Sequence, residues 1–148
     1  MSESLGLHQR TAVGRSEYVQ SASTADFAQL RRLVTYTYSV FPNTTIVISP
    51  DYINIVIAYP QEPGRTLIDD FMLIPEPPRD EKAEDHWRRS FELIDGQVFG
   101  QEDFAIAALS HAGLSSGALT ALELGGLELG IRDFHDKVEA HLRSSSAN

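Results

Sequence analysis

The sequence predicts an α+β fold in which an antiparallel sheet is followed by a long helix. Three apolar runs separated by turn residues, at 44–49, 52–59 and 65–74, predict a β-meander. From Asp80 onward, apolar side chains recur every three or four residues, which is the spacing of an amphipathic helix. With 148 residues, 42% hydrophobic content and no shift in composition, the chain is expected to form one domain.

The predicted strands are amphipathic. In the third strand Asp70 shares a face with apolar side chains. In the second strand Asn54 lies on one face, and the opposite face carries Ile53, Ile55, Ile57 and Tyr59. The sheet therefore has an apolar side that another element must cover.

The long helix is expected to begin near Asp80, because the prolines of residues 75–78 stop the third strand. Gly96 and Gly100 predict an interruption, after which helical spacing resumes from Glu102 to His111. The apolar stripe before the interruption consists of Trp87, Phe91, Ile94 and Val98.

Residues 112–126 carry four glycines and several serines, which predicts a loop that crosses the mouth of a cavity. A final helix is expected after this loop. Its apolar stripe consists of Leu127, Ile131, Phe134, Val138 and Leu142.

The N-terminal residues 1–26 are rich in Ser, Thr, Glu and Gln, and we expect a loosely structured segment with one short strand near residues 7–13. Residues 27–148 are expected to form the domain proper. A short helix is predicted from Asp26, with Phe27, Leu30, Leu33 and Val34 at helical spacing, followed by an extended exit through residues 36–41.

Composition and charge exclude several classes of function. A net charge of −9, with 21 acidic and 12 basic residues, repels a phosphate backbone, so nucleic acid is not an expected partner. No apolar run reaches the roughly 18 residues of a membrane span, and the polar start is no signal peptide, so a cytoplasmic protein is expected. The absence of cysteine excludes an iron–sulfur cluster held by this chain alone.

The acidic residues at the predicted helix interruption are the clearest candidates for chemistry. Glu102 and Asp103 follow Gly100 and Gln101, so they are acidic groups at a predicted helix break, and spacing alone does not make them a metal site. The alternative is a structural role, because acidic side chains in a first helical turn favour the macrodipole.

The five histidines do not form a metal motif by spacing. His111 lies eight residues beyond Asp103, about 12 Å along a continuous helix, whereas both ligands of one ion must lie about 2.1 Å from it. His135 and His141 are six residues apart and fall on different helical faces. Surface or structural histidines are therefore expected.

Several short motifs in order resemble the catalytic domain of Rieske-type ring-hydroxylating oxygenase α subunits. They are Gly6-x-His8-x-Arg10, Phe41-Pro42-Asn43 before a strand, Ser49-Pro50-Asp51-Tyr52, Tyr59-Pro60, Gln101-Glu102-Asp103 opening a helix that reaches Gly113-Leu114, then Glu123, and finally Phe134-His135. The resemblance covers residues 8–142.

The resemblance implies a START-like helix-grip fold, with an antiparallel sheet curled around a long C-terminal helix. It also implies a mononuclear non-haem Fe(II), held by two histidines and one carboxylate, and places that carboxylate at Asp103. Phe99, Gln101, Glu102, Phe104 and His111 become candidates for the pocket wall or for residues around the ligands. A reductase or ferredoxin is the implied electron source.

The chain departs from the family pattern in ways that bear on activity. The Asp-x-x-His-x4-His pattern of the two histidine ligands is absent, as are the cluster ligands of the Rieske domain, and His111 replaces a usual Gln. We therefore expect an incomplete catalytic domain, inactive alone. A companion chain would supply the Rieske 2Fe–2S centre and the histidine pair, and the assembly would hydroxylate a small aromatic or organic substrate.

Two other functions remain open. A curved sheet gripping a helix encloses a cavity, so the chain could be a non-catalytic, START-like module that binds a small ligand. Alternatively it could be a structural subunit that associates into a homo-oligomer through uncovered apolar surface. In every case, marginal stability or dependence on a partner is expected.

Overall fold

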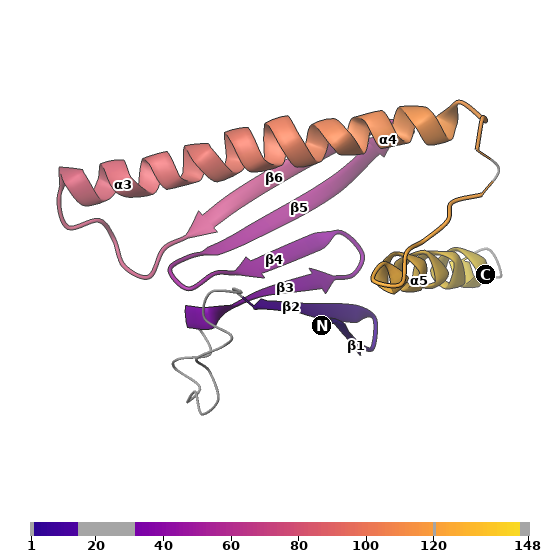
Figure 1. Ribbon diagram of the computed structural model, residues 1–148, viewed down its shortest axis with the longest axis horizontal. Helices are drawn as coiled ribbons and strands as arrows, with labels where there is room; N and C mark the ends of the chain where they lie inside the picture. Colours follow the sequence, from indigo (N-terminus) through magenta and orange to yellow (C-terminus); the bar gives the residue numbers. More distant parts are fainter. Residues whose placement is uncertain (1, 15–31, 120, 146–148) are drawn as a thin grey trace.

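The computed structural model describes residues 2–14, 32–119 and 121–145, and it has the predicted α+β architecture (Figure 1). Six antiparallel strands form one sheet in chain order. Their bounds are β1 Ser2–Leu5, β2 His8–Gly14, β3 Val34–Val40, β4 Thr44–Ile48, β5 Ile53–Glu62 and β6 Arg65–Leu73. The last three are the predicted meander.

The ends of the meander differ slightly from expectation. Residues 60–64 were expected as a loop, but β5 continues to Glu62 through an irregularity between Pro60 and Glu62. Because proline cannot donate to the ladder, a bulge is the usual way for a strand to accommodate it. The β5–β6 connection is consequently a tight turn at Gly64, whose φ is 82°.

The N-terminal part of the chain joins the same sheet. The strand expected near residues 7–13 is β2, and β1 pairs with it as a further strand. Residues 15–31 lie outside the described part, so a domain division near residue 26 stays a prediction. The prediction that Val34 belongs to the helix beginning at Asp26 is wrong, because Val34 is the first residue of β3. Pairing of β3 with β2 and with β4 outweighs the local helical pattern there.

The cross-strand register assigns the strand residues to the two faces of the sheet. Cross-strand register places Gln9, Ser39 and Thr45 in one row of one face, which also carries Asn54 and Asp70. We call this the helix-side face, because the long helix crosses it. The opposite face carries Tyr36, Tyr38, Ile46, Ile48, Ile53, Ile55, Ile57, Phe71 and Leu73, and we call it the apolar face.

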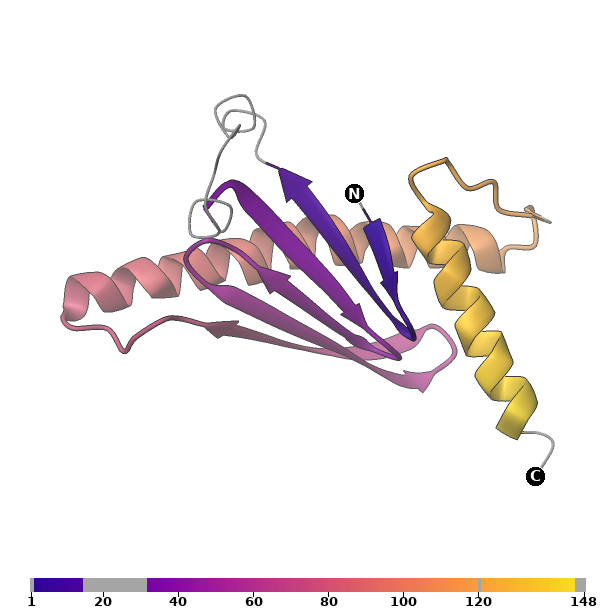
Figure 2. The same ribbon diagram turned by 90° about the horizontal axis from the view of Figure 1, so that it is seen from below.

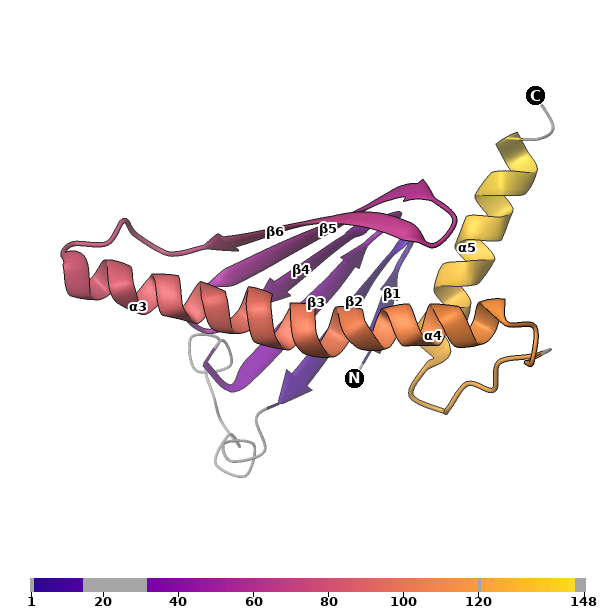
Figure 3. The ribbon, with the colours of Figure 1, turned by 90° about the horizontal axis from the view of Figure 1, so that it is seen from above.

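One long helical rod runs over the helix-side face (Figures 1 and 3). It consists of α3 Glu81–Glu92, a π-helical stretch η1 Leu93–Phe104, and α4 Ala105–Ser115. The rod begins near Asp80, as predicted, and the structure shows that the Asp80 carboxylate caps α3 by accepting a hydrogen bond from the Ala83 N–H at 2.8 Å. Viewed from the other side, the sheet lies in front of the rod, and no described helix covers the apolar face (Figure 2).

The last helix is α5 Leu129–Ser145. It lies beside the end of the sheet that contains the β1–β2 and β3–β4 turns (Figure 2). The helix before it extends to Ser115, so the expected loop is shorter than residues 112–126. Leu127 was predicted on the stripe of this helix but precedes it and is 99% exposed. Sequence spacing extended the stripe past the true start of the helix.

Apolar burial is shallow throughout the described residues. Not one of their apolar side chains is fully buried, and Asn54 is the largest side chain that is. No helix among them is long and apolar enough to cross a membrane. A sheet with one uncovered apolar face and a lightly packed helix fits the incomplete helix-grip domain that the sequence predicts.

Candidate functional site

The predicted interruption of the long helix is a widened helical stretch. From Leu93 to Phe104 the helix is π-helical, so about one extra residue enters each turn. Its half-buried side chains are Ile94, Phe99 and Phe104, five residues apart, whereas α3 repeats every three or four. Val98, predicted on the buried stripe, is 39% exposed, because the wider turn brings Phe99 to the sheet side instead.

Two of the residues expected at a pocket wall lie next to each other as a result. The rings of Phe99 and Phe104 have centroids 5.9 Å apart with an interplanar angle of 32°. Gly100 lies between them, and a Cβ atom there would stand 3.1 Å from the Asp95 carbonyl oxygen. The glycine therefore permits the close backbone approach that the widened turn requires.

Asp103 lies in the last turn of the π-helical stretch, next to this aromatic pair. Asp103, Glu102 and Gln101 are all exposed, and within the described residues none of the three side chains makes a hydrogen bond or ion pair. Because the rod is continuous from Glu81 to Ser115, the expected helix interruption is wrong and no free helix N-terminus lies beneath these acids. The macrodipole therefore gives little reason for a carboxylate here.

His111 lies farther along the same rod, at the tight turn of the sheet. Its Nε2 is 3.3 Å from the Ser115 hydroxyl, and it would be 3.3 Å from a Cβ atom built on Gly64. Because the helix does not break between residues 103 and 111, the two side chains stay about two turns apart. Asp103 and His111 thus occupy different places along the rod.

The other histidines take structural roles. His8 accepts a hydrogen bond at Nδ1 from the Phe41 N–H at 3.1 Å, and His141 lies 2.8 Å from the Lys137 carbonyl oxygen. His86 and His135 each contact the edge of a neighbouring aromatic ring, at centroid distances of 5.0 and 6.0 Å. This agrees with the prediction that they are surface or hydrogen-bonded residues.

Sequence reasoning missed a polar cluster between the sheet and the rod. Asn54 is 1% exposed and donates from Nδ2 to Oδ1 of Asp70 at 3.3 Å. Oδ2 of Asp70 is buried and has no partner among the described residues. Burial raises the pKa of Asp70, and the negative charge of Asp95 on η1 raises it further. The signal was available: two polar side chains occupy one face of neighbouring strands.

A facial-triad iron needs three ligands that converge on one ion. Among the residues that the structure describes, no three His, Asp, Glu or Cys side chains come together in this way. The described residues of this chain therefore do not assemble a facial-triad iron site among themselves. Without cysteine the chain cannot hold a Rieske cluster either.

Residues 6–144 match the family described as ring hydroxylating alpha subunit (catalytic domain). The match spans almost all of the chain and covers β2 to α5, including the π-helical stretch and Asp103. Neither a curated protein nor a solved structure matches the chain.

Proposed function

The chain belongs to the family of ring-hydroxylating oxygenase α subunits, as part of their catalytic domain, and we propose that it contributes the carboxylate ligand of their non-haem iron through Asp103. The observation that carries this proposal is the position of Asp103. It is an unpaired, exposed carboxylate on a π-helical turn, beside an aromatic pair, within the matched region. Such widened turns are frequent at functional sites.

The two histidine ligands and the Rieske 2Fe–2S centre would come from residues outside this chain, in a companion chain or in other parts of a longer protein. A lone carboxylate does not hold ferrous iron in a defined geometry, since affinity and geometry both come from the whole ligand set. On this proposal the chain is inactive alone. In the complete assembly, with electrons from a reductase or ferredoxin, the substrate would be an aromatic or other small organic molecule.

The aromatic pair would form part of the pocket wall. Phe99 and Phe104 lie on the sheet side of the rod, next to Asp103 in sequence. A substrate ring held there would lie near the iron that Asp103 helps to bind. Gln101, Glu102 and His111 remain candidates for residues that position the ligands, with His111 the most distant along the rod.

The test is a chimera in which this chain replaces the corresponding segment of an active α subunit. We expect the chimera to contain mononuclear iron beyond its cluster iron and to hydroxylate an aromatic substrate. Asp103→Ala should remove the mononuclear iron and the product, whereas Glu102→Gln, one residue away, should keep both. Iron and activity that survive in Asp103→Ala would contradict the assignment.

The isolated chain gives a second test that does not depend on the chimera folding. After anaerobic addition of Fe(II) and desalting, we expect no retained iron in either the unmodified chain or Asp103→Ala. One equivalent of iron that is lost in the variant would mean that this chain carries a complete site.

A further inference from the structure

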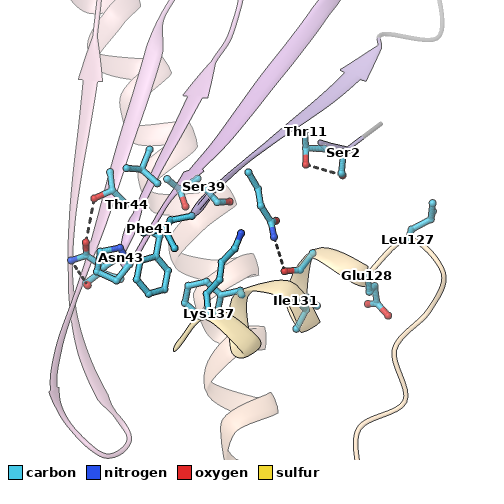
Figure 4. A pocket seen from close by; sticks show the side chains of 18 residues that line it. Ser2, Thr11, Ser39, Phe41, Asn43, Thr44, Leu127, Glu128, Ile131 and Lys137 are labelled. Carbon is cyan, nitrogen blue, oxygen red and sulfur yellow. Dashed lines mark hydrogen bonds between the residues drawn. The ribbon is translucent and has the colours of Figure 1, made fainter. Parts of the chain in front are cut away.

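A cleft lies between the helix-side face of the sheet and α5. Its volume is about 580 Å³, within the size range of pockets that take small organic molecules. Residues from β1, β2, β3, β4 and β5 line one side and α5 lines the other (Figure 4). None of the residues predicted at the iron site lines this cleft.

One wall of the cleft is apolar. Phe41, Ile131 and Phe134 line it, and the rings of Phe41 and Phe134 have centroids 5.9 Å apart. The ring of His141 also contacts Phe41, at a centroid distance of 4.9 Å. Phe41 therefore contacts two rings of α5, so a ligand body would meet an organised surface.

The sheet side of the cleft also carries hydrogen-bonding groups that protein atoms leave unused. Ser39 and Thr45 are direct cross-strand partners, so both hydroxyls lie on the helix-side face. Neither hydroxyl makes a hydrogen bond within residues 2–14, 32–119 and 121–145. Each can both donate to and accept from a ligand.

Lys137 reaches from α5 toward this wall (Figure 4). Its side chain is only 13% exposed, and its Nζ donates to one carboxylate oxygen, Oδ2 of Asp133, at 2.6 Å. An ammonium group has three N–H donors, so two are left for other acceptors. Because the side chain is largely buried, acceptors for these two donors would be favourable, since unsatisfied buried polar groups cost free energy.

The charges around the cleft decide which kind of ligand fits. Lys137 is neutralised by Asp133, which also accepts from Gln9 at 2.6 Å; both hydrogen bonds lower the pKa of Asp133, that of Lys137 more strongly. Glu128, also in the lining, adds a negative charge. The cleft is thus rich in donors yet carries net negative charge, so an anionic ligand is disfavoured.

We propose that the cleft between the sheet and α5 binds an uncharged amphiphilic molecule, with a ring-sized apolar body against Phe41 and Phe134 and a hydroxyl or carbonyl oxygen accepting from Lys137 and Ser39. This site is separate from the iron site and does not depend on it. An uncharged acceptor satisfies the free donors without adding to the negative charge.

The experiment is a titration of the whole 148-residue chain with 2-naphthol, followed by amide chemical shifts. Saturable shifts are expected in residues 39–45 and 130–137. Because 2-naphthoate has the same body but a negative charge, it should bind about tenfold more weakly. No saturable binding of 2-naphthol, shifts elsewhere, or equal or tighter binding of 2-naphthoate would overturn the proposal.

Matched variants test the two polar contacts. Lys137→Met should weaken 2-naphthol binding about five- to tenfold, whereas Lys82→Met, the other lysine of the chain and on the exposed side of α3, should leave it unchanged. Ser39→Ala, at an exposed strand position, should weaken it about threefold and keeps the test valid if Lys137→Met fails to fold. Unchanged affinity in Ser39→Ala, or in a folded Lys137→Met, would contradict the proposed contacts.

The same titration separates this site from the proposed function. Asp103→Ala should bind 2-naphthol as the unmodified chain does. Loss of binding in that variant would contradict a separate site, whereas failure of the iron chimera would leave the cleft proposal unaffected.

Discussion

The two helical elements are attached to the same sheet by different chemistry. α5 is held by Gln9, which donates to the Gly130 carbonyl oxygen at 3.1 Å and to Asp133 at 2.6 Å, and by the contact of Phe41 with Phe134. In the described part of the chain, no side-chain hydrogen bond or ion pair joins the rod of residues 81–115 to the sheet. The rod rests on half-buried apolar side chains, and where carboxylates do face each other, Asp70 and Asp95, they repel.

From this difference we infer that the attachment of α5 is the more rigid and that the attachment of the rod is the more adjustable. Directional hydrogen bonds fix α5 in one position, whereas apolar contacts tolerate small shifts of the rod. The carboxylate proposed as the iron ligand lies on the adjustable element. An adjustable rod is consistent with the proposal that residues outside this chain complete the iron site. The final position of the rod would then be set when those residues bind.

The largest expected effect tests the apolar attachment of the rod. Trp87 on α3 is half-buried and lines clefts with Leu73 and Ile74 at the end of β6. Trp87→Ala should lower the free energy of unfolding by about 2–3 kcal/mol, less than for a fully buried tryptophan. Urea denaturation measures this, and Leu109→Ala, a 73% exposed position on the same rod, should change it by less than about 0.5 kcal/mol. Equal effects would mean that the rod is not held by its apolar stripe.

The next effect is a pH dependence of opposite sign at the two attachments. The pKa of Asp70 is raised by burial, so its contribution to stability is complete below its unfolded pKa and is lost as pH rises through its folded pKa. Asp70→Asn should therefore stabilise the chain at pH 7.5, by at most about 1 kcal/mol because solvent screens a half-buried group, since it removes a charge that has no cationic partner among the described residues. At pH 4 the gain should largely disappear. Asp69→Asn, on the opposite face of the strand, is the control.

At α5 the sign reverses. The pKa of Asp133 is lowered by the hydrogen bonds from Lys137 and Gln9, so its contribution is present above the unfolded pKa and is lost as pH falls through the folded pKa. Asp133→Asn should destabilise the chain at pH 7.5 and have little effect near pH 3. Thermal melts from pH 3 to 8 measure both variants. If the effects of Asp70→Asn and Asp133→Asn on stability change with pH in the same direction, the contrast between the attachments is wrong.

The smallest effect tests the widened turn of the rod. Gly100→Ala should destabilise the chain by roughly 1 kcal/mol, since its Cβ would stand 3.1 Å from the carbonyl oxygen of Asp95. Gly96→Ala meets nothing within 4 Å, so it should stabilise by about 0.5 kcal/mol through reduced freedom of the unfolded chain. Equal effects of the two substitutions would indicate that the close approach at Gly100 is not required.

The sequence by itself determined the elements with strong local signals. Alternating β-branched residues and turn residues predicted β4, β5 and β6, and the prolines of residues 75–78 with the apolar spacing after Asp80 predicted α3. Order and spacing of short motifs also indicated the family that residues 6–144 match. In these segments each residue's preference agrees with the structure around it.

Only the tertiary structure decided the features that depend on partners distant in the chain. Val34 lies in a strand because β2 and β4 flank it, and the helix continues through Gly96 and Gly100 as a π-helical stretch instead of ending there. Three further features join segments that local spacing cannot relate. They are the hydrogen bond between Asn54 and Asp70, the hydrogen bond from Gln9 to Asp133 on α5, and the cleft that Lys137 lines. Helical and strand periodicity follow from neighbours within a few residues, whereas a buried polar contact depends on which surfaces the folded chain brings together.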